Sequence, residues 1–181
     1  MPTSGGGFEQ AYNAQAAVVP GSLLVVANSV VQAPNDKEQV VPMIEQLVAR
    51  EQALGRPDTL IADNGYFSEA NVTACARAKI EPLIAMGREP HHASWRDRFA
   101  KAPQAPLDPM PLEAMAYRLA TTEGKRLYAL RKQTPEPVFG IIKSVMGFRQ
   151  FSLRGLEKVR GEWNLVTLAW NVRRMFALTP A

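Results

Sequence analysis

The order in which two kinds of hydrophobic periodicity follow one another limits the folds open to this chain. Apolar residues alternate with a period of two in residues 10–19, and a β-branched run fills residues 23–31, which predicts a two-stranded hairpin. Short apolar runs at residues 59–62 and 81–85 are typical of strands covered by helices. In most of the remaining chain the apolar residues recur at helical spacing. Strands first, then alternating elements and finally helices predict an α/β protein, with a mixed sheet flanked by helices and a helical C-terminal part.

Helix-forming patterns and their caps complete the predicted secondary structure. Helices are predicted at residues 37–54, 69–79, 112–121, 123–132 and 153–176, and from Glu136 onward after Pro135. Asp36 and its two predecessors offer an N-cap for the first of these helices, and Ser68 offers one for the second. Trp163 and Trp170 stand at helical spacing and are predicted to be core residues. Cys75 is interpreted as a small buried helix residue.

Two segments show no regular pattern. Residues 1–7 are polar and rich in glycine, and they are predicted to be flexible. Residues 86–111 contain five prolines and are predicted to form a long surface loop. His91 and His92 lie in this loop, but adjacent histidines on an extended chain point in different directions, so no zinc site is predicted. Trp95 is equally consistent with stacking on a base and with a packing anchor.

Composition narrows the classes of protein further. The chain has 181 residues, 46% of them hydrophobic and 21% charged, which suits one ordinary globular domain. No apolar run is long enough for a membrane span, and the single cysteine excludes an internal disulfide and favours the cytoplasm. From Lys125 onward, 11 basic and three acidic residues give a net charge of +8, whereas the preceding residues carry −4. This asymmetry favours a polyanionic partner, with a solvated helix surface as the alternative.

Two carboxylates suggest chemistry. Asp63 follows the strand-like run at residues 59–62 and enters the turn Asn64-Gly65, where these residue types also serve simply as turn formers. In α/β proteins, however, ligands bind beyond the carboxyl ends of strands. Glu136 opens a helix, where the helix dipole alone already favours an acid, but Lys143 lies two turns further on the same face. A carboxylate among bases is a good metal ligand beside a polyanion, and the pair suggests part of a two-metal phosphoryl-transfer site.

Several segments, in this order, resemble bacterial insertion-sequence transposases of the DDE type, whose catalytic domain has a ribonuclease-H-like fold. Residues 62–67 (Ala-Asp-Asn-Gly-Tyr-Phe) resemble the segment that carries the second acidic residue of the family. Residues 128–143 resemble its tyrosine–arginine–glutamate–lysine signature, which carries the third. Further similarity lies at residues 7–17, 33–37, 147–151 and 155–161. The resemblance covers roughly residues 5–176 and implies a single, partial catalytic domain over residues 1–181.

The resemblance also implies residue roles. Asp63 and Glu136 would be catalytic and would bind Mg²⁺ or Mn²⁺ for an in-line displacement. Tyr128, Arg131 and Lys143 would contact DNA phosphates, with packing as an alternative for Tyr128. The gap between arginine and glutamate is one residue longer than usual, so Lys132 is an alternative to Arg131. The partners would be transposon ends and target DNA, in the cytoplasm and nucleoid of a bacterium.

One departure from the family pattern concerns the first catalytic Asp. It is expected on a strand upstream of the glycine run, where this sequence has only residues 1–4, and the first acid is Glu9. We therefore expect a truncated copy of a transposase that lacks its first strand. The alternatives are a non-catalytic DNA-binding module and an inactive remnant. A hairpin without its neighbouring strand would expose a sheet edge, which would favour association into homo-oligomers.

Overall fold

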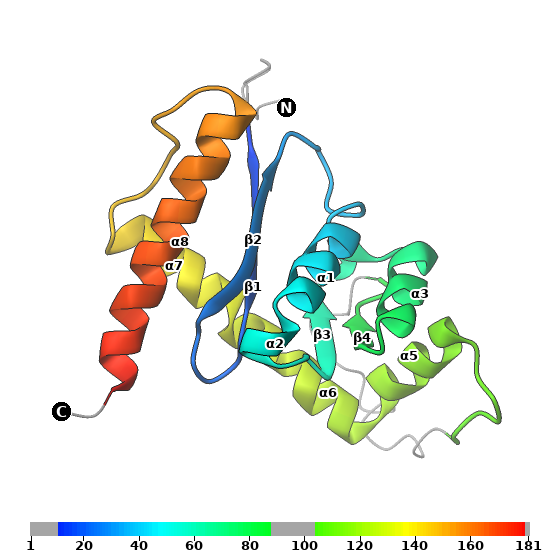
Figure 1. Cartoon of the computed structure of the whole chain (residues 1–181). Coiled ribbons are helices and arrows are strands. Elements are labelled where there is room, and N and C mark those ends of the chain that lie inside the picture. Colours follow the sequence, from blue (N-terminus) through cyan, green and yellow to red (C-terminus); the bar gives the residue numbers. More distant parts are fainter. Residues whose placement is uncertain (1–10, 88–103, 180–181) are drawn as a thin grey trace. The chain divides into compact units, whose positions relative to one another are not determined.

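The computed structural model describes residues 11–87 and 104–179, which divide into two compact units (Figure 1). Unit 1 combines Met1–Asp36 with Lys132–Ala181, and unit 2 is Lys37–Arg131. Each unit contains helices and a two-stranded sheet, so the α/β class is confirmed, with two small sheets in place of the predicted single one. The predicted flexible start and most of the predicted long loop, with His91, His92 and Trp95, lie outside the described residues.

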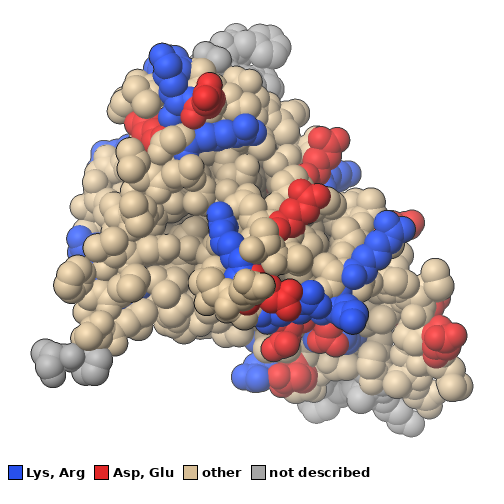
Figure 2. Space-filling view, in the orientation of Figure 1, with Lys and Arg blue, Asp and Glu red and all other residues tan. Residues whose placement is uncertain are grey.

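The charged side chains do not gather into one area on the face that Figure 2 shows. Lysines and arginines lie beside aspartates and glutamates there, and the described residues form no continuous basic surface on this face. None of the helices within residues 11–87 and 104–179 has both the length and the apolar character that a transmembrane span requires.

Unit 1 is built on the predicted hairpin. Strand β1 (Asn13–Val18) pairs antiparallel with β2 (Val25–Val31), with Ala14 opposite Val30. The tight connection contains Gly21 at φ +80°, a conformation that favours glycine. Helices α7 (Pro135–Ser144) and α8 (Leu156–Leu178) pack against the hairpin.

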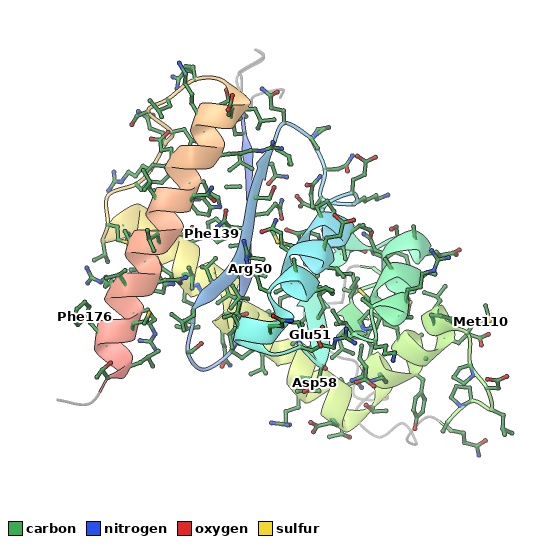
Figure 3. All side chains as sticks on the ribbon, in the orientation of Figure 1. Arg50, Glu51, Asp58, Met110, Phe139 and Phe176 are labelled. Atoms are coloured by element: carbon green, nitrogen blue, oxygen red, sulfur yellow. The ribbon has the colours of Figure 1, made fainter. Side chains whose placement is uncertain are left out.

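Aromatic and β-branched residues form the core of unit 1. Trp163 is 2% exposed and Trp170 is 3% exposed, which confirms the prediction that both are core residues. Phe139 of α7 stacks on Trp163 with ring centroids 5.5 Å apart, in the layer between α7 and α8 (Figure 3). Helix α8 begins three residues later than predicted, immediately after Gly155 at φ +88°.

Unit 2 alternates helices with short strands. Strand β3 pairs parallel with β4, as two strands joined by a crossover helix do. The elements are α1 (Val40–Ala49), α2 (Glu51–Leu54), β3 (Thr59–Ala62), α3 (Glu69–Arg77), β4 (Glu81–Ile84), α5 (Pro111–Ala120) and α6 (Thr122–Ala129). Their side chains form two small aliphatic clusters. Cys75 lies fully buried in the first cluster, as predicted.

The first predicted helix of unit 2, at residues 37–54, is wrong at its start and in its continuity. Helix α1 begins only at Val40, because Pro42 lacks an N–H and is tolerated only within the first turn. At Arg50 the backbone reaches φ −104° and ψ 8°, which separates α1 from α2.

The predicted N-cap at Asp36 is also wrong. Gln39 occupies the cap position of α1 and makes no side-chain cap bond. The Asp36 carboxylate instead accepts hydrogen bonds within unit 1, from Asn13 Nδ2 at 2.6 Å and Gln15 Nε2 at 2.8 Å. Two amide donors on β1 therefore outcompete the helix for this carboxylate.

The predicted helix at residues 123–132 ends early. Helix α6 stops at Ala129, and a 3₁₀ turn, η2 (Leu130–Gln133), follows. A helix cannot continue past Thr134, because helical backbone geometry is unfavourable for the residue before a proline. Pro135 is instead the first residue of the next helix, α7.

Candidate functional site

Asp63 lies where the sequence predicts it, immediately after β3 in unit 2. Its extended backbone, at φ −82° and ψ 178°, leaves the strand, and its Oδ1 accepts a hydrogen bond from Gly65 N at 2.9 Å. Asp63 thereby caps the 3₁₀ helix η1 (Asn64–Tyr66). Asp63 therefore acts as a turn former and is still a candidate site residue. The bond to Gly65 N uses its Oδ1, and its Oδ2 lies outside the turn.

A buried amide that the sequence argument did not single out anchors this turn. Asn71 of α3 is 2% exposed, and its Nδ2 donates to the carbonyl oxygens of Tyr66 at 2.7 Å and of Lys37 at 2.6 Å. Its backbone N–H donates to Ser68 Oγ at 3.1 Å, which confirms Ser68 as the N-cap of α3. In the sequence, the one sign of this role is that Asn71 is a polar residue within a short, amphipathic helix.

Tyr128 and Arg131 come together with Asp63 inside unit 2. Arg131 Nη1 lies 3.8 Å from Asp63 Oδ2. The guanidinium carbon of Arg131 is 5.6 Å from the centroid of the Tyr128 ring, within the range of a cation–π contact. Three residues predicted from two distant segments therefore form one cluster at the carboxyl end of β3.

Glu136 and Lys143 share helix α7 in unit 1. Glu136 is exposed in the first turn, between Pro135 and Pro137. Neither proline has an N–H, and the first turn is where helices tolerate their absence. Lys143 is exposed in the last turn of the same helix, so each charge has the sign that the helix dipole favours at its end. Lys132, in η2, is also exposed.

The two carboxylates predicted to bind metal, Asp63 in unit 2 and Glu136 in unit 1, are each a suitable donor for a hard divalent cation. Asp63 is a carboxylate with 48% of its side chain exposed, and Glu136 is an exposed carboxylate. Magnesium is commonly held by one or two carboxylates together with water and phosphate oxygens, so each of these residues, taken by itself, fits as a ligand. Among residues 11–87 and 104–179, no group of three or more His, Cys, Asp or Glu side chains gathers to hold a metal.

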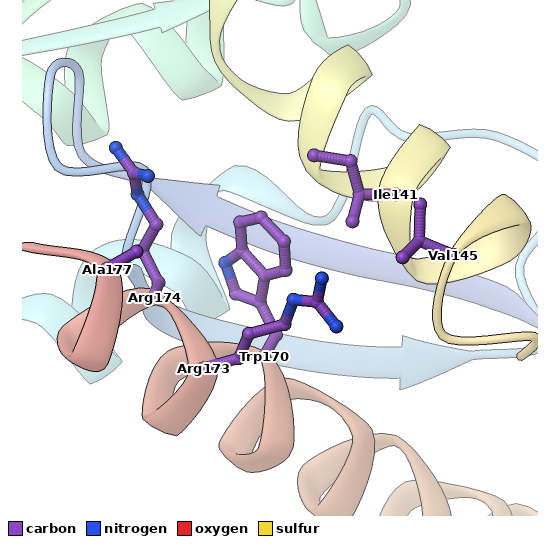
Figure 4. A pocket seen from close by; sticks show the side chains of 6 residues that line it. All are labelled: Ile141, Val145, Trp170, Arg173, Arg174 and Ala177. Carbon is purple, nitrogen blue, oxygen red and sulfur yellow. The ribbon is translucent and has the colours of Figure 1, made fainter.

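A pocket of about 210 Å³ in unit 1 has a different character (Figure 4). It lies between α7 and α8, with the Trp170 indole at its base and Arg173 at its side. Arg174 also lines it, although its Nε donates to Ser22 O at 2.6 Å. The lining contains no carboxylate, so this pocket offers no metal ligands and is not part of the candidate site.

Comparison with known protein families supports the sequence argument over the C-terminal part of the chain. Residues 109–176 match the model of a family described as a transposase DDE domain. The match confirms the resemblance of the chain to DDE-type transposases. The matched range includes five of the predicted site residues, Tyr128, Arg131, Lys132, Glu136 and Lys143, and does not include Asp63. No curated protein and no solved structure matches the chain.

Proposed function

We propose that this chain is the C-terminal catalytic part of a DDE transposase with a ribonuclease-H-like fold, which serves metal-dependent DNA strand cleavage and transfer. The family match over residues 109–176 carries this proposal, because it includes the whole signature at residues 128–143. The position of Asp63 at the carboxyl end of a parallel strand supports it independently, since α/β proteins bind ligands there.

In this proposal Asp63 and Glu136 are the two carboxylates that hold Mg²⁺ or Mn²⁺. The bound cation would lower the pKa of an attacking hydroxyl and stabilise the leaving oxygen. The protein's own contribution is to fix these carboxylates, through the Gly65 N–H bond to Asp63 and through the position of Glu136 in the first turn of α7.

The partner in this proposal is DNA, both transposon ends and target. Lys132 and Lys143 are exposed cations, suited to phosphate contacts as point charges. Tyr128 and Arg131 are assigned phosphate contacts as well. Phosphate contacts should make duplex binding fall with salt, at a log–log slope of about −0.9 per phosphate neutralised. Such a protein would act in the bacterial cytoplasm, on the DNA of the nucleoid.

We also propose that residues 1–181 alone do not cleave DNA. Two-metal catalysis requires ligands that hold both ions about 3.5–4 Å apart. The family pattern supplies two carboxylates here, and Glu9 is the only acid in residues 1–35. Asp63 and Glu136 alone are too few ligands to hold two ions at that separation.

Cation binding tests the two carboxylates separately. Titration calorimetry with Mn²⁺ on the full chain should show at least tenfold weaker binding for Asp63→Asn and for Glu136→Gln. Asp58→Asn is the matched control for the first variant, because Asp58 is an exposed acid just before β3 and Asp63 stands just after it. Glu157→Gln is the control for the second, because Glu157 is an exposed acid in the first turn of α8. Equal Mn²⁺ affinity in all five proteins would overturn the assignment.

A non-catalytic DNA-binding module is the second candidate function. The net charge of +8 from Lys125 onward favours it. In that case Asp63→Asn and Glu136→Gln would leave duplex binding unchanged, and the chain would bind Mn²⁺ no better than either variant does.

A further inference from the structure

The two oxygens of the Asp63 carboxylate have different surroundings. Oδ1 is fixed by the backbone N–H of Gly65 at 2.9 Å, inside the turn. Oδ2 faces the guanidinium of Arg131, whose Nη1 lies 3.8 Å away. Oδ2 is the oxygen that a cation can bind without sharing it with the Gly65 N–H, and this oxygen already has a positive charge beside it.

Arg131 is held in this place more firmly than a free surface arginine would be. Its side chain is only 24% exposed, whereas the side chain of Asp63 is 48% exposed. The Tyr128 ring lies against it, with the guanidinium carbon 5.6 Å from the ring centroid. Lys132, the next residue, is exposed instead. The two adjacent bases therefore differ in exposure, and Arg131 pairs with the candidate metal ligand Asp63.

We propose that Arg131 is a positioning residue for Asp63, which holds Oδ2 in the cation-free protein and competes with a divalent cation for that oxygen. This inference rests on the proposed function, because it requires Asp63 to be a cation ligand. Lys132, which is exposed, then provides a phosphate contact. Binding of a cation requires the guanidinium to leave Oδ2, and a DNA phosphate is an acceptor suited to receive it bidentately.

The competition has a definite sign and a modest size. A fixed positive charge about 4 Å from the ligand oxygen repels a divalent cation, and the existing ion pair must also be broken. Partly exposed ion pairs are weak, so the expected effect on cation affinity is only about two- to fivefold. An arginine that served only to bind DNA would leave the affinity for a cation in the absence of DNA unchanged.

The test is calorimetric titration of the full chain with Mn²⁺ in the absence of DNA. Arg131→Gln should bind Mn²⁺ about two- to fivefold more tightly than the unmodified chain. Arg131→Lys keeps the positive charge and should stay within about twofold of the unmodified chain. Arg118→Gln is the matched control, because Arg118 is also in unit 2, is 26% exposed and forms an ion pair with Glu81 away from Asp63. It should leave Mn²⁺ affinity unchanged.

The outcomes separate this inference from the proposed function. If Asp63→Asn removes Mn²⁺ binding while Arg131→Gln binds Mn²⁺ as the unmodified chain does, or more weakly, the competition is refuted and the proposed function stands. If Asp63→Asn leaves Mn²⁺ binding intact, the proposed function fails, and this inference fails with it. Circular dichroism of each variant establishes that it is folded. If Arg131→Gln does not fold, Arg131→Met takes its place, because methionine keeps an unbranched apolar side chain beside Tyr128 and removes the charge. Mn²⁺ affinity about two- to fivefold above that of Arg118→Gln would support the competition, and an equal or lower affinity would refute it.

Discussion

The two units solve the problem of fixing short strands in different ways. In unit 1, one long helix, α8, binds the backbone of the hairpin with its side chains. Trp163 Nε1 donates to Gln15 O at 3.0 Å, and Asn171 bonds to both the N–H and the carbonyl of Val25, each at 2.8 Å. In unit 2, the strands β3 and β4 are covered by small aliphatic clusters and by turns capped at close range.

This difference bears on where a functional group can stand. Four polar side chains of α8 bond to the backbone of the hairpin and so serve its structure, namely those of Arg160, Trp163, Asn171 and Arg174. In unit 2, the caps at Asp63 and Ser68 hold a turn at the strand end, and the carboxylate of Asp63 keeps one oxygen outside the cap. A turn fixed by local hydrogen bonds can therefore present a charged side chain. The apolar clusters beneath the turn do not use that side chain for packing.

The largest expected effect comes from weakening the contact between α8 and the hairpin of unit 1. Trp163→Ala removes a 2% exposed indole that stacks on Phe139 and bonds to Gln15 O. Truncating a buried aromatic to alanine costs about 3–5 kcal/mol, and we expect a loss of this size in the free energy of unfolding measured by urea denaturation.

Trp163→Phe separates the two parts of that effect. Phenylalanine keeps an aromatic ring beside Phe139 but cannot donate to Gln15 O and is smaller than the indole, so this variant should lose only about 1–2 kcal/mol. A loss as large as that of Trp163→Ala would show that the part of the indole that phenylalanine lacks, with its N–H, holds α8 on the hairpin, rather than the ring stacked on Phe139.

The sequence predicted most helices and strands of both units, but not the side-chain hydrogen bonds that join them. The helical spacing of Trp163 and Trp170 identified the buried face of α8, because packing periodicity is local. The acceptor of each indole, Gln15 O or Leu23 O, lies about 150 residues away and carries no residue-type signal, since any residue has a carbonyl. The same holds for the pairing of Asp36 with amides of β1, where the local N-cap pattern was misleading.

The candidate site was predictable to a similar extent. The strand-end position of Asp63 followed from the apolar run before it and the Asn64-Gly65 turn after it. The ion pair of Asp63 with Arg131 did not, because it joins segments 68 residues apart that meet only through the packing of α3, α5 and α6. Asn71 was missed because a single buried amide leaves no periodic trace in the sequence.

The next effect sharpens the comparison by testing a close backbone approach in unit 2. Gly124, at the corner between α5 and α6, is buried, and a Cβ there would lie 1.7 Å from Arg118 O. Thr121 Oγ1 bridges the same corner, accepting from Gly124 N at 3.0 Å and donating to Arg118 O at 2.7 Å. Gly124→Ala must displace backbone, and we expect it to lower the free energy of unfolding by about 2–3 kcal/mol.

Gly161→Ala in α8 is the matched control for that prediction. A Cβ at Gly161 meets no atom within 4 Å, and its backbone is helical. Alanine in a helix interior is favoured over glycine by about 0.5–1 kcal/mol, so this variant should be slightly more stable than the unmodified chain in the same urea titration. If both substitutions had the same effect, the corner at Gly124 would not be the tight approach that the structure shows.

The smallest expected effect concerns the apolar cluster of unit 2 and appears only at alkaline pH. Burial raises the pKa of the Cys75 thiol to about 11, because the thiolate would have to form inside the cluster of Val40, Ile44 and Ile80. The unfolded chain ionises this thiol at the ordinary value, near pH 8.5–9. The stabilisation by the neutral thiol is therefore fully present below about pH 8.5 and is lost as the pH rises through about 11, with about 1–2 kcal/mol gone at pH 10.

Unfolding free energies of the chain and of Cys75→Ala, compared at pH 7.5 and pH 10, isolate this contribution from other titrations: the difference between the two proteins should shift by that amount in favour of Cys75→Ala. Parallel behaviour at both values would mean that the thiol ionises as easily in the folded protein as in the unfolded one, and that the cluster around Cys75 is open to water.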